Sequence, residues 1–311
     1  MASAEFDLID RYFKQQSVTH ASTRLGIGDD CALLTIPAGY ELALTADTMV
    51  ENVHFFAGTD PEALGHKLLA VNLSDLAAMG AKPLSVMLAL TLPSIDQAWL
   101  TAFAKGFFTL ANRYQVDLIG GDTTQGPLTL TVQALGVVPV QQAMTRSAAQ
   151  VGDVICMTGL LGDAGLGLKI AQGYTCSNSK AALERLHKPE PRIHEGLFLK
   201  DIAHACIDIS DGLVADLGHI VKQSRVGACL EWDRLPLSSE LKNYISATGD
   251  WQMPLIAGDD YELCFTLHPS KLAQLNIAYT PIGLIDSGPG VRIHKASKLH
   301  TLSKLGYEHF S

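Results

Sequence analysis

The apolar positions at the start of the chain change from helical to strand-like spacing. From Phe6 to Phe13 they recur every three or four residues, which predicts a short amphipathic helix. Two apolar runs come next, at 31–36 and 41–45, with a Pro-Ala-Gly turn between them. Strand-like runs joined by a short turn predict a β-hairpin.

The rest of the first half alternates helices with strands. Pro61 opens a long helix that runs to Met79, where Gly80 stops it. Further patterns predict a strand at 84–92, a helix at 95–114, and strands at 116–119 and 128–138. Because neighbouring strands look antiparallel, this order predicts an α+β domain over residues 1–138.

A polar stretch between Pro139 and Gly152 separates this half from the second half of the chain. We place the domain boundary there and expect a second domain at 139–311, since one compact core is near its limit at this chain length. Its patterns predict helices at 179–186, 191–204 and 213–223, strands at 154–158, 206–209, 228–232 and 263–267, and a final pair of strands.

Composition narrows the class of protein. Of 311 residues, 47% are apolar and 18% charged, which is typical of a globular chain with a large core. The 23 Lys and Arg against 32 Asp and Glu leave a net charge of −9, which argues against binding nucleic acid or anionic membranes. Six scattered cysteines and no apolar run of spanning length indicate a soluble, cytoplasmic protein.

Aspartates recur immediately after small residues at the ends of apolar runs. The five places are Gly28-Asp29-Asp30, Ala46-Asp47, Gly121-Asp122, Ser210-Asp211 and Gly258-Asp259-Asp260. Each pair alone is also typical of an ordinary turn or helix cap, and Asp211 is placed to cap the following helix. Their recurrence instead favours a shared site on loops and strand ends.

Asp75 lies among apolar residues of the helix at 61–79, where an uncompensated carboxylate is costly. Converging carboxylates repel one another by about 4 kcal/mol at 4 Å and an effective dielectric near 20, so they need a cation. Oxygen ligands without His or Cys favour Mg²⁺ or Mn²⁺. Acids holding Mg²⁺ beside glycine-rich loops are typical of nucleotide phosphate sites.

The common nucleotide motifs are absent from the sequence, including the P-loop and the protein-kinase set. The glycines from Gly159 to Gly165 suit either a phosphate cradle at a helix start or tight helix packing, and both interpretations stay open. These features together predict an ATP-using enzyme outside the commonest kinase folds.

Ordered motifs along nearly the whole chain resemble the thiamine-monophosphate kinase family. They are 26–32, Asp47-Thr48 with 53–55, 71–80, 120–124, 208–213, 260–263 and the terminal 306–310. The wider superfamily includes aminoimidazole ribonucleotide synthetase, selenophosphate synthetase and a hydrogenase maturation protein. The resemblance implies an α+β N-terminal domain that builds a homodimer, an α/β C-terminal domain, and ATP bound across the pair.

The resemblance also implies roles for individual residues. Several Mg²⁺ ions would be held by Asp30, Thr45, Asp47, Asp75, Asp122, Asp208 and Asp211, with Ala46 contributing only its backbone carbonyl. Gly121, Asp122, Arg146 and Ser210 would contact ATP, and His54, Asp259 and Tyr307 would hold the thiamine part. Two positions depart from the family: Ala46 replaces a hydroxyl residue, and Asp259 is shorter than the family's Glu.

The implied reaction is in-line transfer of the ATP γ-phosphoryl group to thiamine monophosphate, giving thiamine diphosphate. A phosphate monoester has its second pKa near 6, so the acceptor is already largely a dianion and no general base is expected. Two alternatives stay open. In the first alternative, the chain is another ATP-using member of the superfamily that acts on a ribonucleotide or on selenide. In the second, it is a non-catalytic nucleotide-binding maturation scaffold.

Overall fold

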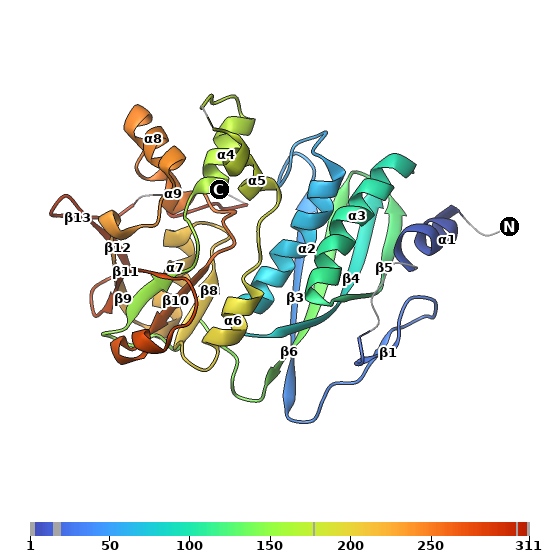
Figure 1. The fold of residues 1–311 in the computed structure, drawn as a ribbon, viewed down its shortest axis with the longest axis horizontal. Coiled ribbons are helices and arrows are strands. Elements are labelled where there is room, and N and C mark those ends of the chain that lie inside the picture. Colours follow the sequence, from blue (N-terminus) through green and yellow to red (C-terminus); the bar gives the residue numbers. More distant parts are fainter. Residues whose placement is uncertain (1–3, 15–19, 177, 303, 310–311) are drawn as a thin grey trace. The chain divides into compact units, whose positions relative to one another are not determined.

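The computed structural model describes residues 4–14, 20–176, 178–302 and 304–309. It forms two compact units (Figure 1). The first contains residues 1–76 and 81–141, and the second contains 77–80 and 142–311. Across the described ranges, every helix is too short or too polar to cross a bilayer.

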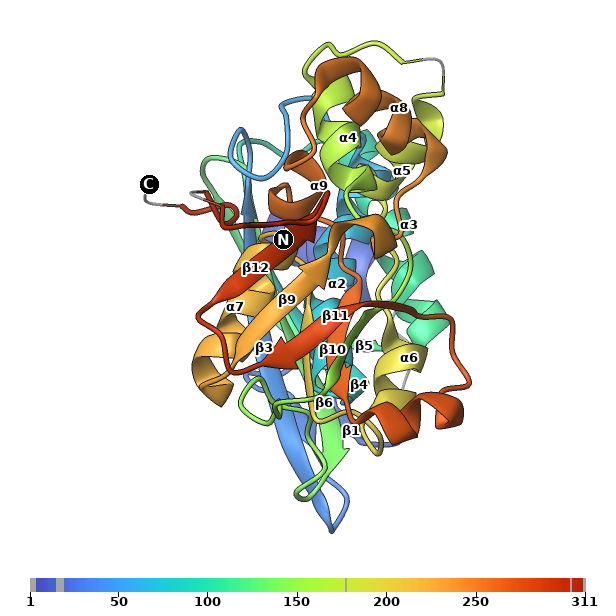
Figure 2. The same ribbon diagram turned by 90° about the vertical axis from the view of Figure 1, so that its left-hand side faces the viewer.

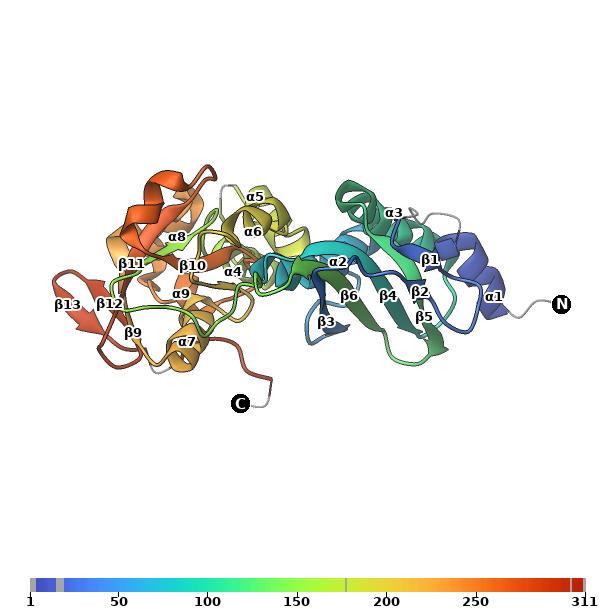
Figure 3. The same cartoon turned by 90° about the horizontal axis from the view of Figure 1, so that it is seen from below.

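The first unit is built on a four-stranded sheet. Its elements are α1 (Ala4–Ile9), η1, a π-helix (Asp10–Lys14), β1 (Thr23–Leu25), β2 (Leu33–Leu34), β3 (Tyr40–Val50), α2 (Pro61–Ala78), β4 (Lys82–Leu92), α3 (Gln97–Tyr114), β5 (Asp117–Gln125) and β6 (Thr129–Pro139). The strand order is β3-β6-β4-β5, with β4 and β5 parallel and the other pairs antiparallel. Helices α2 and α3 cover one face of this sheet (Figure 3).

The two covering helices begin and end where their sequences indicate. Asp60 accepts backbone N–H bonds in the first turn of α2, and Asp96 caps α3 through Ala98 and Trp99. The helices approach closely at Gly65, because a Cβ there would lie 2.2 Å from the Phe103 carbonyl oxygen. The predicted helices at 61–79 and 95–114 are therefore confirmed to within about two residues.

The predicted hairpin of 31–36 and 41–45 is wrong. Strand β2 pairs with β1, whereas β3 pairs along its full length with β6. The apolar runs indicate strands correctly, but the local pattern carries no information on the distant partner that each strand finds. Strand β3 also extends to Val50 and β5 to Gln125, so Asp47 and Asp122 lie within strands and not on the loops expected for them.

The second unit is built on a seven-stranded sheet with helices around it. Its elements are β7 (Val154–Met157), α4 (Asp163–Ala171), α5 (Lys180–His187), α6 (Ile193–Leu199), β8 (Ala205–Asp208), α7 (Leu213–Ser224), β9 (Gly227–Glu231), η2 (Trp232–Arg234), α8 (Ser239–Thr248), α9 (Met253–Ile256), β10 (Leu263–Leu267), η3 (Pro269–Gln274), β11 (Thr280–Asp286), β12 (Val291–Lys295) and β13 (Lys298–His300). The strand order is β13-β12-β9-β11-β7-β10-β8. Among the described strands of this sheet, only β12 and β9 pair in parallel (Figure 2).

The glycine-rich segment of the second unit serves helix packing. A Cβ at Gly165 would lie 2.4 Å from that of Ala257, and one at Gly167 would lie 2.3 Å from the Ala182 carbonyl oxygen. The N–H of Gly162 points at the buried Asp260 carboxylate and not at an open phosphate site. Of the two interpretations of this segment, the packing one is supported.

Candidate active site

One group of candidate residues joins β3 to α2. The hydroxyl of Thr45 donates a hydrogen bond to Asp75 Oδ2. Two residues along, the backbone N–H of Asp47 donates to Asn72 Oδ1 at 3.1 Å. Asn72 is fully buried and its own side-chain amide donates to the Leu68 carbonyl, so its orientation is fixed within α2. Strand β3 and helix α2 are thereby joined at the Thr45, Asp47 and Asp75 group.

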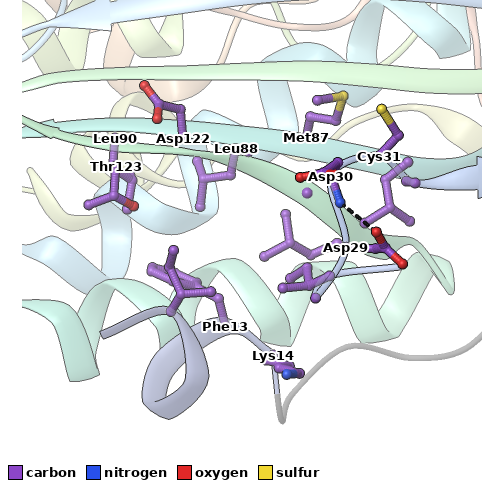
Figure 4. A pocket seen from close by; sticks show the side chains of 18 of the residues that line it. Phe13, Lys14, Asp29, Asp30, Cys31, Met87, Leu88, Leu90, Asp122 and Thr123 are labelled. Carbon is purple, nitrogen blue, oxygen red and sulfur yellow. Dashed lines mark hydrogen bonds between the residues drawn. The ribbon is translucent and has the colours of Figure 1, made fainter. Parts of the chain in front are cut away.

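A second group lines a pocket of about 870 Å³ in the same unit (Figure 4). Asp30 reaches it from the loop between β1 and β2, and Gly121 and Asp122 reach it from β5. The Asp30 N–H donates to Asp29 Oδ1 at 2.9 Å, which shapes the loop. Lys14 also lines this pocket. The pocket therefore offers carboxylates and a lysine around an open space.

These two groups lie on opposite faces of the four-stranded sheet. Asp47 is in register with Val132 and Leu88, which are buried beneath the helices. Asp122 is instead in register with Ala89 on β4. Met87 lies two residues before Ala89, and therefore on the same face of β4, and its side chain is 39% exposed. Since side chains alternate along a strand, Thr45 and Asp47 face the helices and Asp122 faces the open side.

Ala46 is exposed, and by the same alternation its side chain lies on the open face, away from its neighbours Thr45 and Asp47. Only its backbone carbonyl remains as a possible metal ligand, as expected for this departure from the family.

Gly121 has a structural reason to be glycine. A Cβ at this position would lie 1.8 Å from the carbonyl oxygen of Leu88 on β4. Any side chain would therefore push β5 away from its parallel neighbour and displace Asp122 with it.

His54 lies in the turn that follows β3. Its Nδ1 accepts the N–H of Val50 at 3.0 Å, which fixes the imidazole tautomer and leaves Nε2 carrying the proton of the neutral ring. The imidazole thus stabilises the turn.

The second unit carries its candidate residues at the end of β8. Asp208 is the last residue of this strand and only 3% exposed. Ser210 and Asp211 follow in the short loop before α7. The carboxylate Oδ2 of Asp216 accepts the N–H groups of Ser210, Asp211 and Gly212. The alternative interpretation of Asp211 as a helix cap is not supported, because the residue at the N-cap of α7 is Gly212 and no side chain caps this helix.

Two further segments meet the loop at Ser210 and Asp211. The N–H of Asp259 donates to the Ser210 carbonyl at 2.8 Å, and the N–H of Tyr307 donates to the Asp211 carbonyl at 3.0 Å. The Tyr261 hydroxyl donates to Asp259 Oδ1 at 3.1 Å. The candidate nucleotide and thiamine residues of this unit are thus brought together. Phe310, at the end of the terminal motif, lies outside the described residues.

Nearby charged side chains, including that of Arg146, change the pKa of Asp211 in this loop. Burial raises the pKa of Asp211 above its ordinary value. The nearby His219, His309 and Arg146 lower that pKa, whereas Asp259 raises it further. Arg146 is exposed and its carbonyl accepts the Ser224 hydroxyl at 2.9 Å. Its guanidinium is close enough to Asp211 to lower the pKa of that carboxyl, and a guanidinium suits a phosphate.

The donor set suits a hard cation, although no preformed cage is present. Among the described residues, no group of three or more His, Cys, Asp or Glu side chains is arranged to hold a metal ion. The candidate ligands are carboxylate and hydroxyl oxygens, which Mg²⁺ prefers, and Mg²⁺ usually takes only one or two carboxylates together with phosphate oxygens. The residues therefore fit Mg²⁺ bound with a nucleotide.

Sequence reasoning missed three supporting residues. Asn72 and Asp216 hold backbone N–H groups beside candidate ligands. Glu262, fully buried, forms ion pairs with Arg185 and Arg192 and accepts the Thr158 hydroxyl. Asn72 and Glu262 lie within the family motifs, which could have marked them. For Asp216 the available signal was its place: it is an acid in the first turn of a helix that begins after a glycine.

Family models match both halves of the chain. Residues 28–138 match the AIR synthase related protein N-terminal domain, and residues 150–277 match the corresponding C-terminal domain. These matches confirm the two-domain fold class that the resemblance implied.

Full-length relatives narrow the family. The chain is 47% identical to the thiamine-monophosphate kinase of Haemophilus influenzae, over 93% of this chain and 92% of the relative. A crystal structure of the Stenotrophomonas maltophilia enzyme of that name matches with a TM-score of 0.85 at 44% identity, over 94% of this chain and 97% of the other. The structure of AaThiL complexed with AMPPCP and TMP matches with a TM-score of 0.81 at 30% identity, over 89% of each chain. This chain belongs to the thiamine-monophosphate kinase family.

Proposed function

We propose that this protein transfers the γ-phosphoryl group of ATP to the phosphate of thiamine monophosphate, giving thiamine diphosphate and ADP. The observation that carries the proposal is the match along nearly the whole chain to AaThiL, which was solved with the ATP analogue AMPPCP and with TMP. Kinases of this name at 39–47% identity over at least 93% of this chain support the same reaction.

The acceptor needs no general base. A phosphate monoester is mostly a dianion at neutral pH, since its second pKa is about 6. One of its oxygens attacks the γ-phosphorus while the bond to the β–γ bridging oxygen breaks, and ADP leaves. The protein's task is to bring two anions together in line and to neutralise their charge.

In this proposal the acids neutralise no charge themselves but would hold the Mg²⁺ ions that do. Asp30 and Asp122, on the pocket of the first unit, and Asp47 on β3 with Asp75 on α2 would hold Mg²⁺ together with Thr45 and the Ala46 carbonyl. Asp208 and Asp211 serve the same purpose in the second unit. Bound Mg²⁺ stabilises the negative charge on the transferring phosphoryl group.

Nucleotide contacts come from residues near these acids. Gly121 and Asp122 present the β5 backbone and carboxylate to the pocket. Ser210 lies on the loop that Asp216 holds, and Arg146 supplies a guanidinium beside Asp211. A guanidinium binds phosphate oxygens through two parallel hydrogen bonds, which orients the phosphate as well as attracting it.

We assign the thiamine part to His54, Asp259 and Tyr307. Tyr307 is 44% exposed and its ring packs edge-on against His309, which leaves aromatic surface for a ligand ring. The Asp259 carboxylate, oriented by the Tyr261 hydroxyl, suits the positively charged thiazolium ring. His54 presents Nε2 as a hydrogen-bond donor.

We further propose that the protein is a cytoplasmic homodimer. Its six cysteines are all free thiols, as a reducing compartment requires. On the edge strand β3, the side of the first sheet opposite α2 and α3 exposes Leu44 at 56%, together with Tyr40 and Leu42. An apolar sheet face of this kind suits burial against a second copy of the chain.

Phosphorus NMR of the product mixture tests the reaction. With ATP, Mg²⁺ and thiamine monophosphate, we expect the acceptor's monophosphate signal to be replaced by paired diphosphate signals as ADP accumulates. Inorganic phosphate without thiamine diphosphate would contradict transfer. Nucleotide binding without any acceptor-stimulated turnover would instead indicate a scaffold.

A further inference from the structure

We infer that Asp216 is a positioning residue that fastens the nucleotide loop and the thiamine-side segments into one assembly. The inference rests on the proposed kinase function and deepens it. Asp216 itself is 3% exposed and touches no substrate in this proposal. It acts through the backbone of Ser210, Asp211 and Gly212.

One carboxylate oxygen holds three consecutive backbone groups. Asp216 Oδ2 accepts the N–H of Ser210 at 3.0 Å and those of Asp211 and Gly212 at 3.1 Å each. Gly212, which precedes α7, has no side chain with which to cap the helix, and its φ of 124° suits glycine. The carboxylate therefore reaches back from the first turn of α7, as the acid of a capping box does, and fixes the orientation of three successive peptide groups.

The opposite sides of these same peptide groups hold the thiamine-side residues. The peptide between Ser210 and Asp211 donates its N–H to Asp216 and accepts the Asp259 N–H through its carbonyl. The peptide between Asp211 and Gly212 donates to Asp216 and accepts the Tyr307 N–H. Asp259 and Tyr307 are thus each one peptide group away from the buried carboxylate, and such chains of hydrogen bonds polarise one another.

The segments that carry Asp259 and Tyr307 are packed directly against the loop at Ser210 and Asp211. A Cβ at Gly258 would lie 2.2 Å from the Ser210 carbonyl oxygen, and one at Gly306 would lie 2.5 Å from that of Asp211. Both glycines immediately precede residues assigned to thiamine, Asp259 and Tyr307. A shift of the loop must therefore move both of these residues.

Asp216→Leu tests this coupling, because leucine has the same branched arrangement of side-chain heavy atoms and offers no acceptor. We expect KM for ATP and KM for thiamine monophosphate to rise together by about tenfold or more, since three hydrogen bonds to one buried acceptor are lost. Asp216→Asn keeps an acceptor oxygen in place, so its KM values should stay within about threefold of the parent. A rise in only one KM, or none in a folded Leu variant, would overturn the inference.

Asp153→Leu is the matched control. Asp153 is also buried, accepts the N–H of Gln150 and pairs with His204, away from the candidate residues. Its replacement should lower Tm and leave both KM values unchanged. If Asp216→Leu behaves in the same way, with lower Tm and parental KM values, Asp216 is merely structural.

Hydrogen exchange supplies a second measurement if the Leu variant does not fold. In Asp216→Asn the acceptor is neutral and weaker, so the amides of 210–212 should exchange faster than in the parent. The coupling predicts that the amides of Asp259 and Tyr307 also exchange faster, and parental exchange there would contradict it. If the parent fails to phosphorylate thiamine monophosphate, the proposed function fails independently of these results.

Discussion

The Thr45 hydroxyl on β3 donates a hydrogen bond to the Asp75 carboxylate on α2. The place of Asp75 in an apolar helix predicts a nearby cation, which stays a prediction, and the structure supplies a hydroxyl donor. A neutral hydroxyl orients a carboxylate without neutralising it. In the proposed metal site, Thr45 would therefore set how the Asp75 carboxylate faces the cation.

Thr45→Val is expected to raise the Mg²⁺ concentration needed for half-maximal ADP release by about tenfold, because losing a residue that orients a metal ligand costs about 10- to 100-fold in affinity. Thr45→Ser should restore the parental value. Thr48→Val is the control, since Thr48 lies on the same strand but bonds to Thr131 on the open face. An unchanged Mg²⁺ requirement in Thr45→Val would make the Thr45 to Asp75 contact purely structural.

Asp122→Asn should reduce kcat/KM by about 100-fold or more, since losing a carboxylate that would hold the charge-neutralising Mg²⁺ removes several kcal/mol of transition-state stabilisation. Steady-state kinetics over a range of Mg²⁺ concentrations measures the effect. Asp201→Asn, at an exposed acid paired with Lys200, is the control and should remain parental. Parental Mg²⁺ dependence in Asp122→Asn would remove Asp122 from the site.

Leu44→Glu should convert the proposed dimer to monomers, because a charge placed at the centre of an apolar interface costs several kcal/mol. Sedimentation velocity at micromolar concentration measures the change. Leu299→Glu is the matched control, since Leu299 is 62% exposed on β13 of the second unit. A parent protein that is already monomeric would contradict the proposed dimer.

Stability should fall with rising pH because of Asp260. Burial raises the pKa of this carboxyl to about 8, whereas an unfolded aspartate titrates near 3.9. The folded state therefore holds the extra proton between these values. The stability that this proton contributes is full below about pH 4 and is lost as pH rises through about 8.

Asp260→Asn should accordingly make Tm depend less steeply on pH between about 5 and 8. Asp286→Asn is the control: its hydrogen bond with Arg292 holds the pKa of Asp286 below its ordinary value. The stability that ionised Asp286 contributes is lost only as the pH falls below the pKa of an unfolded aspartate. Above about pH 5, the dependence of Tm on pH in Asp286→Asn should therefore equal that of the unsubstituted protein. A parental slope in Asp260→Asn would show that Asp260 does not titrate in this range.

The local elements were largely predictable from the sequence. Pro61 and Gly80 mark the two ends of α2, and the runs that became β4 and β6 are strongly apolar. Helix α8, strand β11 and the pairing of β3 with β6 were not predicted. Strand pairing is set by contacts between distant segments, which a local pattern does not carry.

The candidate residues were predictable as a set but not in their arrangement. The recurrent aspartates mark Asp30, Asp122 and Asp211, yet the division of the first unit's acids between two faces results from the register of β3 and β5. The role of Asp216 depends on which N–H groups the fold directs at it. Neither the register nor these N–H directions is encoded in a short motif.

The most direct test is ADP release by the purified protein with ATP and Mg²⁺, measured in parallel with thiamine monophosphate, thiamine and an aminoimidazole ribonucleotide precursor as acceptors. We expect turnover that depends on thiamine monophosphate and is near background with the other two. Turnover of thiamine or of the ribonucleotide precursor, with thiamine monophosphate ignored, would contradict the proposed function.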